Sequence, residues 1–268
     1  MRKNTAWSGV WAKLTVLAFI APLATVVLWS VAKSWPWPEL LPTEYSTRGL
    51  SHVFRPSSGA VKSLVTSFKL SAVVTFLSLV ASVLAGKSLG IYEFRGKRVV
   101  KLLSIAPIIV PSMAVAMGIH SVFIKLGLSN TFAGVVLVHM ITTIPYGIRI
   151  FTDIFEITGE RLEDQARVLG AGPFKAFIYI TLPVISPGIA SAGSLMFIVS
   201  FSQYFLTFLI GGGNLVTYPM MMVPYIQSGD RSMASAYSLV FVVVTLVILF
   251  AIEKGVKLYY GDKDKFYF

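Results

Sequence analysis

The residues that could do chemistry are few and widely separated. His52, His120 and His139 are the only histidines, and His120 and His139 have no carboxylate near them in the sequence. Metal sites and catalytic triads need clustered partners at defined spacing. The chain has no cysteine, which excludes disulfides, thiolate metal sites and cysteine nucleophiles. We therefore expect no metal, no cofactor and no catalytic residue. His139 is interpreted as a packed, hydrogen-bonded side chain, with a cavity-facing histidine as the alternative.

One short motif suggests phosphate binding. Ala85-Gly86-Lys87-Ser88 is similar to the end of the phosphate-binding loop GxxxxGK[ST]. The first glycine of that pattern would stand at position 81, which is Ala81, and the segment ends an apolar run instead of following a strand. Lys87 is therefore interpreted as a cytoplasmic anchor, and the chain itself is not expected to bind ATP.

Composition indicates a membrane protein. Hydrophobic residues make up 55% of the chain and charged residues 13%, and the mean hydropathy is +0.75. Soluble domains carry about 25% charged residues. Apolar runs recur that can each cross a hydrocarbon core of about 30 Å. The predicted fold is all-α and polytopic. It is a single transmembrane domain, 1–268, with six spans at about 14–32, 61–86, 102–123, 131–150, 177–210 and 232–252.

The net charge of +11 is distributed in a way that fits a membrane and not a nucleic acid. Basic residues form four groups at alternate ends of the apolar runs, within 2–13, 87–101, 149–175 and 254–265. The positive-inside rule then predicts that both termini are cytoplasmic, and the basic groups can attract anionic lipid. The first apolar run is interpreted as a retained span. A cleaved signal peptide is the alternative, although no small-x-small site follows before Trp35.

Residues 159–183 form the only long charged segment in the second half of the chain, and they predict two short helices. We expect Thr158 to cap the first helix, with Glu160 in its opening turn, where a carboxylate suits the helix dipole. Glu163 and Arg167 are four residues apart and can pair on the exposed side. A narrow apolar face is predicted from the spacing of Leu162, Ala166 and Leu169.

The two predicted helices are separated by helix-ending and helix-starting residues. Gly170 stands where a left-handed residue ends a helix, and Pro173 opens the next one. A charged helix pair between two membrane spans needs a contact in the aqueous phase. The segment is therefore predicted to be a docking element.

The same segment carries a resemblance to a known family. Asp164-Gln165-Ala166, Gly170 and Leu182-Pro183 resemble the EAA loop of ATP-binding-cassette (ABC) importer permeases of the binding-protein-dependent type, which reads Glu-Ala-Ala, three residues, Gly, and later Leu-Pro. Asp164 replaces the usual Glu, and Gln165 replaces the first Ala. In that family the loop forms coupling helices that sit in a cleft of a cytoplasmic ATPase subunit.

The resemblance covers roughly residues 63–252. Pro107–Gly118, residues 126–139 and Ile144-Pro145-Tyr146 are similar to the spermidine/putrescine, ferric-iron and thiamine branch. The resemblance implies that the solute is a polyamine or another small solute. Members of that branch often carry an acidic residue where this chain has Gln203, and this difference argues against a cationic polyamine.

The resemblance also implies partners and residue roles. The partners are cytoplasmic ATPase subunits, a second permease chain (identical or homologous), an extracytoplasmic solute-binding protein and membrane lipid, all at a bacterial-type inner membrane. ATP hydrolysis is expected on the separate ATPase, and transport by alternating access. The implied coupling residues are Glu163, Asp164, Gln165, Ala166, Gly170, Leu182 and Pro183.

Two sets of residues are candidates for the solute path. In the fifth span, polar residues share one face at helical spacing: Ser200, Gln203, Tyr204 and Thr207. In the third span, Met113 and Met117 are four residues apart. Interhelical hydrogen bonding is the alternative explanation for the first set, and core packing is the favoured explanation for the second. The alternative function is an ion-coupled carrier or channel without an ATPase. That reading is disfavoured because no Asp or Glu lies inside a predicted span.

Overall fold

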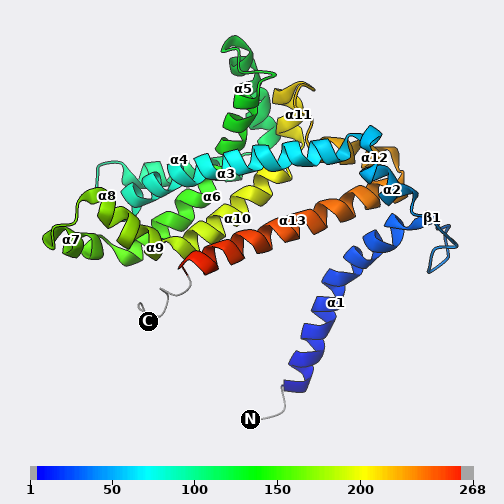
Figure 1. The fold of residues 1–268 in the computed structure, drawn as a ribbon, viewed down its shortest axis with the longest axis horizontal. Helices are drawn as coiled ribbons and strands as arrows, with labels where there is room; N and C mark the ends of the chain where they lie inside the picture. Colours follow the sequence, from blue (N-terminus) through cyan, green and yellow to red (C-terminus); the bar gives the residue numbers. More distant parts are fainter. Residues whose placement is uncertain (1–4, 261–268) are drawn as a thin grey trace. The chain divides into compact units, whose positions relative to one another are not determined.

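The computed structural model describes residues 5–260, and almost all of its regular structure is helical (Figure 1). Four helical segments among these residues are long and apolar enough to cross a membrane: Lys13–Ser30, Ala60–Ile91, Phe132–Thr158 and Arg231–Leu258. Two strongly bent helix pairs raise the number to six if each pair is one span. The predicted all-α, polytopic fold is confirmed.

The described residues divide into two compact units. The first contains residues 5–63 and Met220–Val244, and the second contains Leu64–Pro219 and residues 245–260. The division passes through three helices, α3 (Ala60–Ile91), α12 (Tyr218–Ser228) and α13 (Arg231–Tyr260).

The first unit combines long helices with a small hairpin. It contains α1 (Thr5–Ser30), strands β1 (Ala32–Ser34) and β2 (Glu44–Tyr45), α2 (Arg48–Phe54), the 3₁₀ helix η1 (Pro56–Ser58) and parts of α3, α12 and α13. The two strands pair antiparallel, with Ala32 opposite Tyr45. Helix α2 lies tightly on α13, because a methyl group at Gly49 would lie 2.8 Å from Cβ of Ala236.

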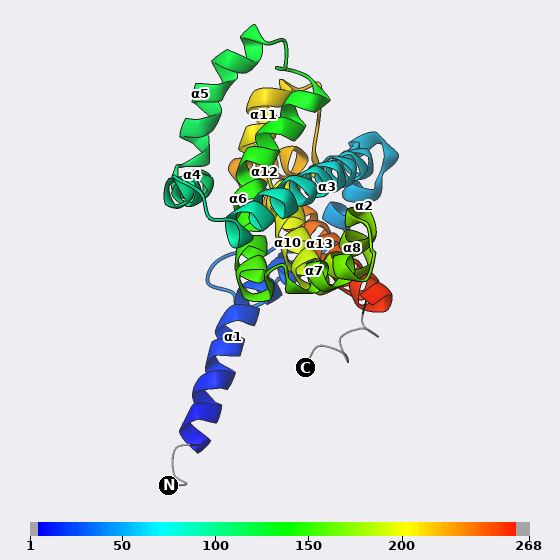
Figure 2. The same ribbon diagram turned by 90° about the vertical axis from the view of Figure 1, so that its left-hand side faces the viewer.

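The second unit is built around α6 (Phe132–Thr158), on which α4, α10 and α11 pack (Figure 2). Its other helical elements are α4 (Lys97–Ile109), α5 (Ser112–Lys125), α7 (Arg161–Val168), α8 (Pro173–Ala176), the π-helical turn η2 (Phe177–Thr181), α9 (Leu182–Val184), α10 (Ser186–Phe201) and α11 (Phe205–Gly211).

Small residues let α3 approach α6 closely. A methyl group at Gly86 would lie 2.5 Å from Cβ of Phe151, and one at Gly90 would lie 2.6 Å from Cβ of Phe155. Small hydroxyl residues favour close packing between membrane helices. Four of them in α3 are buried here: Ser67, Ser71, Ser78 and Ser82. The C-terminal half of α3 is therefore held by backbone-close contacts that leave no room for a larger side chain.

The third and fifth predicted spans are each divided in the structure. Helices α4 and α5 meet at a bend of 101°, where Val110 is extended and Pro111 precedes α5. The segment before α10 makes a second bend of 71°, and α10 ends at Phe201, before α11 begins at Phe205. Proline lacks the backbone donor that would continue a helix. The segment between the fifth and sixth predicted spans contains the helix α12.

Candidate functional site

The coupling segment begins with a glycine that turns the chain between α6 and α7. Gly159 has φ of +62° and ψ of −163°, a conformation that favours glycine. The hydroxyl of Thr158 donates to the carbonyl of Ile154, in the last turn of α6, at 2.6 Å. Glu160 is the N-cap residue of α7, and no side chain caps that helix. The prediction that Thr158 caps α7 was therefore wrong, because this hydroxyl is used by the preceding helix.

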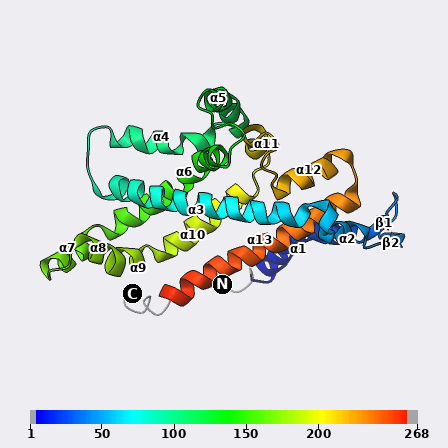
Figure 3. The same cartoon turned by 45° about the horizontal axis from the view of Figure 1, so that its top comes forward.

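The turn between α7 and α8 has the predicted geometry. Gly170 has φ of +88°, the left-handed conformation expected at the end of α7. Pro173 stands in the first turn of α8, as the sequence predicted. The two short helices contact each other and lie beside α9 at the same end of this unit (Figure 3).

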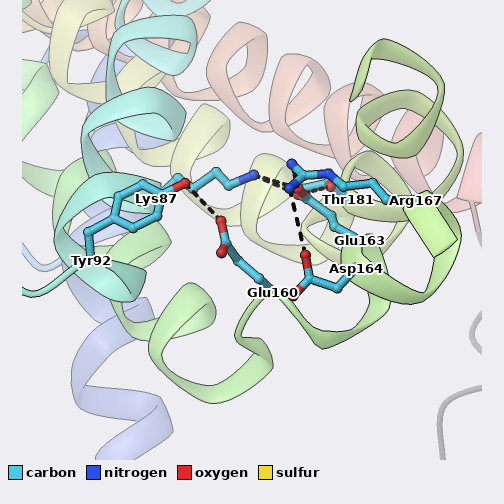
Figure 4. Close-up of polar contacts among 7 residues, drawn as sticks. All are labelled: Lys87, Tyr92, Glu160, Glu163, Asp164, Arg167 and Thr181. Atoms are coloured by element: carbon cyan, nitrogen blue, oxygen red, sulfur yellow. Dashed lines mark hydrogen bonds and ion pairs between the residues drawn. The ribbon is translucent and has the colours of Figure 1, made fainter. Parts of the chain in front are cut away.

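Glu163 of α7 points inward, not outward. Its carboxylate oxygens each lie 2.7 Å from Nζ of Lys87 in α3, and the hydroxyl of Thr181 in η2 donates to the same carboxylate (Figure 4). Arg167 lies 3.5 Å away, on the next turn of α7. Only 9% of the Glu163 side chain and 20% of the Lys87 side chain are exposed. The predicted pair of Glu163 and Arg167 exists, but its carboxylate is buried and its main partner is Lys87.

The surroundings keep the Glu163 carboxyl ionised. Burial by itself raises its pKa. The hydrogen bonds from Lys87 and Thr181, with the positive charges of Lys87 and Arg167, outweigh burial and hold the pKa below its ordinary value of 4.5. The cluster at neutral pH is therefore a charged, hydrogen-bonded ion pair that joins α3, α7 and η2.

A second contact joins α3 to the start of α7. The hydroxyl of Tyr92, directly after α3, donates to Oε1 of Glu160 at 2.8 Å. This bond raises the pKa of the Tyr92 phenol above its ordinary value, because the hydrogen bond to the carboxylate stabilises the protonated phenol. Two side chains at the C-terminal end of α3 thus hold α7, although about 70 residues separate the partners in sequence.

The exposed part of the segment carries apolar side chains beside its charged ones. Leu162 and Ala166 are half-buried, whereas Leu169, the third member of the predicted apolar face, is 88% exposed. Val168 is 87% exposed and Phe174 is 75% exposed. Sequence reasoning did not select Val168 or Phe174, although their signal is visible as apolar side chains flanking the Gly170–Pro173 turn of a charged segment.

Of the remaining predicted coupling residues, two are exposed on α7 and two pack into the interior of the unit. Asp164 and Gln165 are exposed on α7, where Asp164 lies 3.6 Å from Arg167. Pro183 is buried and Leu182 is half-buried against the apolar cluster around Phe151 and Ile185. Leu182 and Pro183 therefore position the segment, and Asp164 and Gln165 are available to a partner.

His139 of α6 is at the centre of a second buried polar cluster. Its Nδ1 lies 3.0 Å from the hydroxyl oxygen of Ser200 in α10, and its Nε2 lies 3.0 Å from that of Thr207 in α11. All three side chains are buried. The expectation of a packed, hydrogen-bonded histidine is confirmed. Among the described residues, no group of three His, Cys, Asp or Glu side chains could hold a metal ion.

The candidate path residues do not share one helical face. Ser200 and Thr207 turn toward His139, on either side of the interruption between α10 and α11. Gln203 and Tyr204 lie in the interruption and are partly exposed. The prediction of a single polar face assumed a continuous helix and was wrong in that respect. Met113 and Met117 are 59% and 69% exposed on α5, which packs against α11.

Comparison with known proteins gives a consistent result. Residues 78–254 match the family model described as "Binding-protein-dependent transport system inner membrane component". The chain is 25% identical over 260 residues to a putative 2-aminoethylphosphonate transport system permease protein of Salmonella typhimurium, covering 95% of this chain and 96% of the relative. It is also 25% identical to an arabinooligosaccharides transport system permease protein of Halalkalibacterium halodurans, covering 93% and 94%.

Solved structures share the fold. A chain of a bacterial ABC transporter involved in the import of the acidic polysaccharide alginate superimposes with a TM-score of 0.70 at 15% identity, over 95% of this chain and 98% of that chain. The alginate transporter in complex with an alginate pentasaccharide-bound periplasmic protein gives a TM-score of 0.65 at 13% identity, over 97% and 99%.

Proposed function

The chain belongs to the family of binding-protein-dependent transport system inner membrane components, and we propose that its α7–α8 segment docks on a cytoplasmic ATPase. As a member of that family it is a permease subunit of an ABC importer, a transport subunit and not an enzyme. ATP is hydrolysed on a separate subunit in these systems. The family is one of multi-pass inner-membrane proteins, and we propose that both termini of this chain are cytoplasmic.

The exposed apolar surface of the segment carries the docking proposal. Val168, Leu169 and Phe174 are each at least 75% exposed. Val168 and Leu169 lie at the end of α7, outside the candidate spans, and Phe174 lies in the first turn of the bent pair that begins at Pro173. Large apolar side chains exposed around one turn of a charged segment indicate a surface that a partner covers. Asp164 and Gln165 border this surface and supply polar contacts at its rim.

Docking gives the segment its mechanical role in alternating access. When ATP closes the ATPase dimer, the docked α7–α8 segment moves with it. The helices of the permease then exchange inward-facing and outward-facing arrangements. The ATPase shifts this equilibrium only by as much as it favours one arrangement. Gly170 makes the turn that presents both helices to the same partner.

We place the solute path near the interruption between α10 and α11. Gln203 and Tyr204 are the partly exposed polar residues there, and Met113 and Met117 are the exposed apolar residues of the neighbouring α5. Ser200 and Thr207 contribute indirectly, because their hydroxyls bond to His139 and fix the helix ends on both sides of the interruption.

The solute is a small polar compound delivered by an extracytoplasmic binding protein. Related permeases are named for 2-aminoethylphosphonate and arabinooligosaccharides, and a related structure holds a periplasmic binding protein. A polyamine of the spermidine/putrescine type is the less favoured candidate, because the path residues above carry no carboxylate to bind a cation. A second permease chain, identical or homologous, completes the pathway.

Co-purification in mild detergent tests the docking proposal. The tagged chain is isolated from its own host, and the ATPase that remains bound is quantified by mass spectrometry. We expect Leu169→Asp and Asp164→Lys to lose most of the bound ATPase, because each changes the exposed side of α7. Leu258→Asp is the matched control, since Leu258 is 77% exposed on α13, away from the segment.

Two results would contradict the proposal. One is full retention of the ATPase by both α7 variants. The other is a wild-type chain that carries no ATPase and transports solute alone in liposomes, which would support the carrier alternative.

A further inference from the structure

The exposed side of α7 explains docking, but not how movement of α7 reaches the membrane helices. Along the chain, α7 is attached through two glycines. Gly159 and Gly170 have φ of +62° and +88°, and a Cβ added at either would meet no described heavy atom within 4 Å. Glycine restricts the backbone less than any other residue. The chain connections alone therefore transmit force poorly in either direction.

The side-chain contacts of α7 bypass both glycines. Glu163 lies in the middle of the helix and is its buried residue. It bonds to Lys87 in α3 and to Thr181 in η2. Lys87 binds both carboxylate oxygens at 2.7 Å, so the ion pair fixes the orientation of the carboxylate as well as its position.

The receiving end of this contact is rigid. Lys87 lies between Gly86 and Gly90, the two positions where α3 approaches the α6 residues Phe151 and Phe155. A close-packed interface of this kind transmits a displacement instead of absorbing it. A movement of α7 carried through Glu163 therefore reaches α3 and α6 together.

We propose that Lys87 is a positioning residue for energy coupling: with Glu163 and Thr181 it forms a joint that makes α7 move with α3. This rests on the proposed function, and it assigns Glu163 a different role from the docking residues. Glu163 is too buried to contact an ATPase directly. Its carboxylate lies on the buried side of α7 and connects the docking helix to the membrane helices. Tyr92 and Glu160 form a weaker, more exposed second contact of the same joint.

Spin-label distances test the joint without knowledge of the solute. The chain has no cysteine, so labels at Leu84→Cys in α3 and Arg161→Cys in α7 attach only there. The labelled permease is then combined with the ATPase subunits. The distance between the labels is measured without nucleotide and after trapping with ATP and vanadate. Bound ATPase is quantified in the same samples.

In the wild-type complex, and with Lys87→Arg, we expect one narrow distance distribution that is unchanged on trapping. With Lys87→Met the distribution should widen and its mean should shift on trapping, while the amount of bound ATPase stays within about twofold of wild type. Thr181→Val, which removes one bond and keeps the ion pair, should give a smaller widening. Lys257→Met is the matched control, because Lys257 forms an exposed ion pair of 2.6 Å with Glu253 in α13.

The outcomes separate this inference from the proposed function. An unchanged, narrow distribution in Lys87→Met would overturn the joint, and so would loss of bound ATPase in parallel with the widening, because Lys87 would then serve docking itself. If Lys87→Met does not accumulate, Thr181→Val decides between these outcomes. A wild-type chain that binds no ATPase would overturn the proposed function, and the inference with it.

Discussion

The second unit contains two buried polar clusters whose chemistry differs. At the coupling segment, a carboxylate, an ammonium group and a guanidinium group meet around Glu163. Around His139, the partners are the hydroxyls of Ser200 and Thr207. The first cluster connects a short helix to a long one, and the second connects three helices that pack along their lengths.

The difference follows from the solvent near each cluster. Ionised groups are expensive to bury in a medium of low dielectric constant, and the cost is smaller near water. The Lys87 side chain is still 20% exposed near the C-terminal end of α3. His139 lies within the long apolar helix α6 and is fully buried. Charged groups thus connect α7 to α3 at a partly exposed position, while neutral groups fix the packing of helices in the buried interior of the unit.

The largest expected effect comes from the close contact between α3 and α6, which supports the charged cluster. Gly86→Leu should reduce the free energy of unfolding by about 3 kcal/mol, because the new side chain cannot fit against Phe151 without separating α3 from α6. Gly118→Leu is the control, since a Cβ there meets no described heavy atom within 4 Å. Thermal unfolding monitored by size-exclusion chromatography measures both. Equal melting temperatures for the two variants would contradict the close α3–α6 contact.

Removing the neutral cluster around His139 should lower the stability of the whole second unit. His139→Leu should cost about 1–2 kcal/mol, because two interhelical hydrogen bonds are lost and their hydroxyls remain buried. A lower melting temperature is expected, with no change in the rate at which trypsin cleaves α7. If α7 becomes easier to cleave while the melting temperature stays the same, the two clusters are not separate in function.

Weakening the charged cluster around Glu163 should destabilise α7 alone. Glu163→Gln should raise trypsin cleavage at Arg161 and Arg167 about tenfold, because α7 opens between its flanking glycines once the ion pair is lost. The melting temperature should hardly change. Asp164→Asn is the matched control on the neighbouring exposed residue, and its cleavage rate should equal that of wild type. A tenfold rise in that control would show that either acidic residue holds α7.

Acid should release the same joint. Because the pKa of Glu163 in the folded protein lies below its ordinary value of 4.5, its contribution is fully present above about pH 4.5 and is lost as pH falls through the lower, folded value. The positively charged side chains that face this carboxylate are Lys87 and Arg167. A spin label at Gln165→Cys should become more mobile below about pH 4.5 in wild type. A label that reports the same acid transition in Glu163→Gln would assign the transition to another group.

The sequence determined the features that depend on local chemistry. Apolar runs and the distribution of basic residues indicated a polytopic α-helical protein, because a bilayer admits few other structures. The spacing around Gly170 and Pro173 predicted two short helices separated by a left-handed turn, because these residue types have restricted or special backbone preferences. The buried, hydrogen-bonded state of His139 also followed from its place in an apolar run.

Only the tertiary structure decided which side chains meet and which way they face. Glu163 was assigned to the exposed side from its spacing to Arg167, and Lys87 was interpreted as an anchor. Their ion pair spans 76 residues and forms because α3 and α6 approach each other at two glycines. The interruption between α10 and α11 likewise turned Ser200 and Thr207 toward His139 and left Gln203 partly exposed. Helical spacing cannot predict these orientations, because they depend on contacts between segments that are distant in the chain.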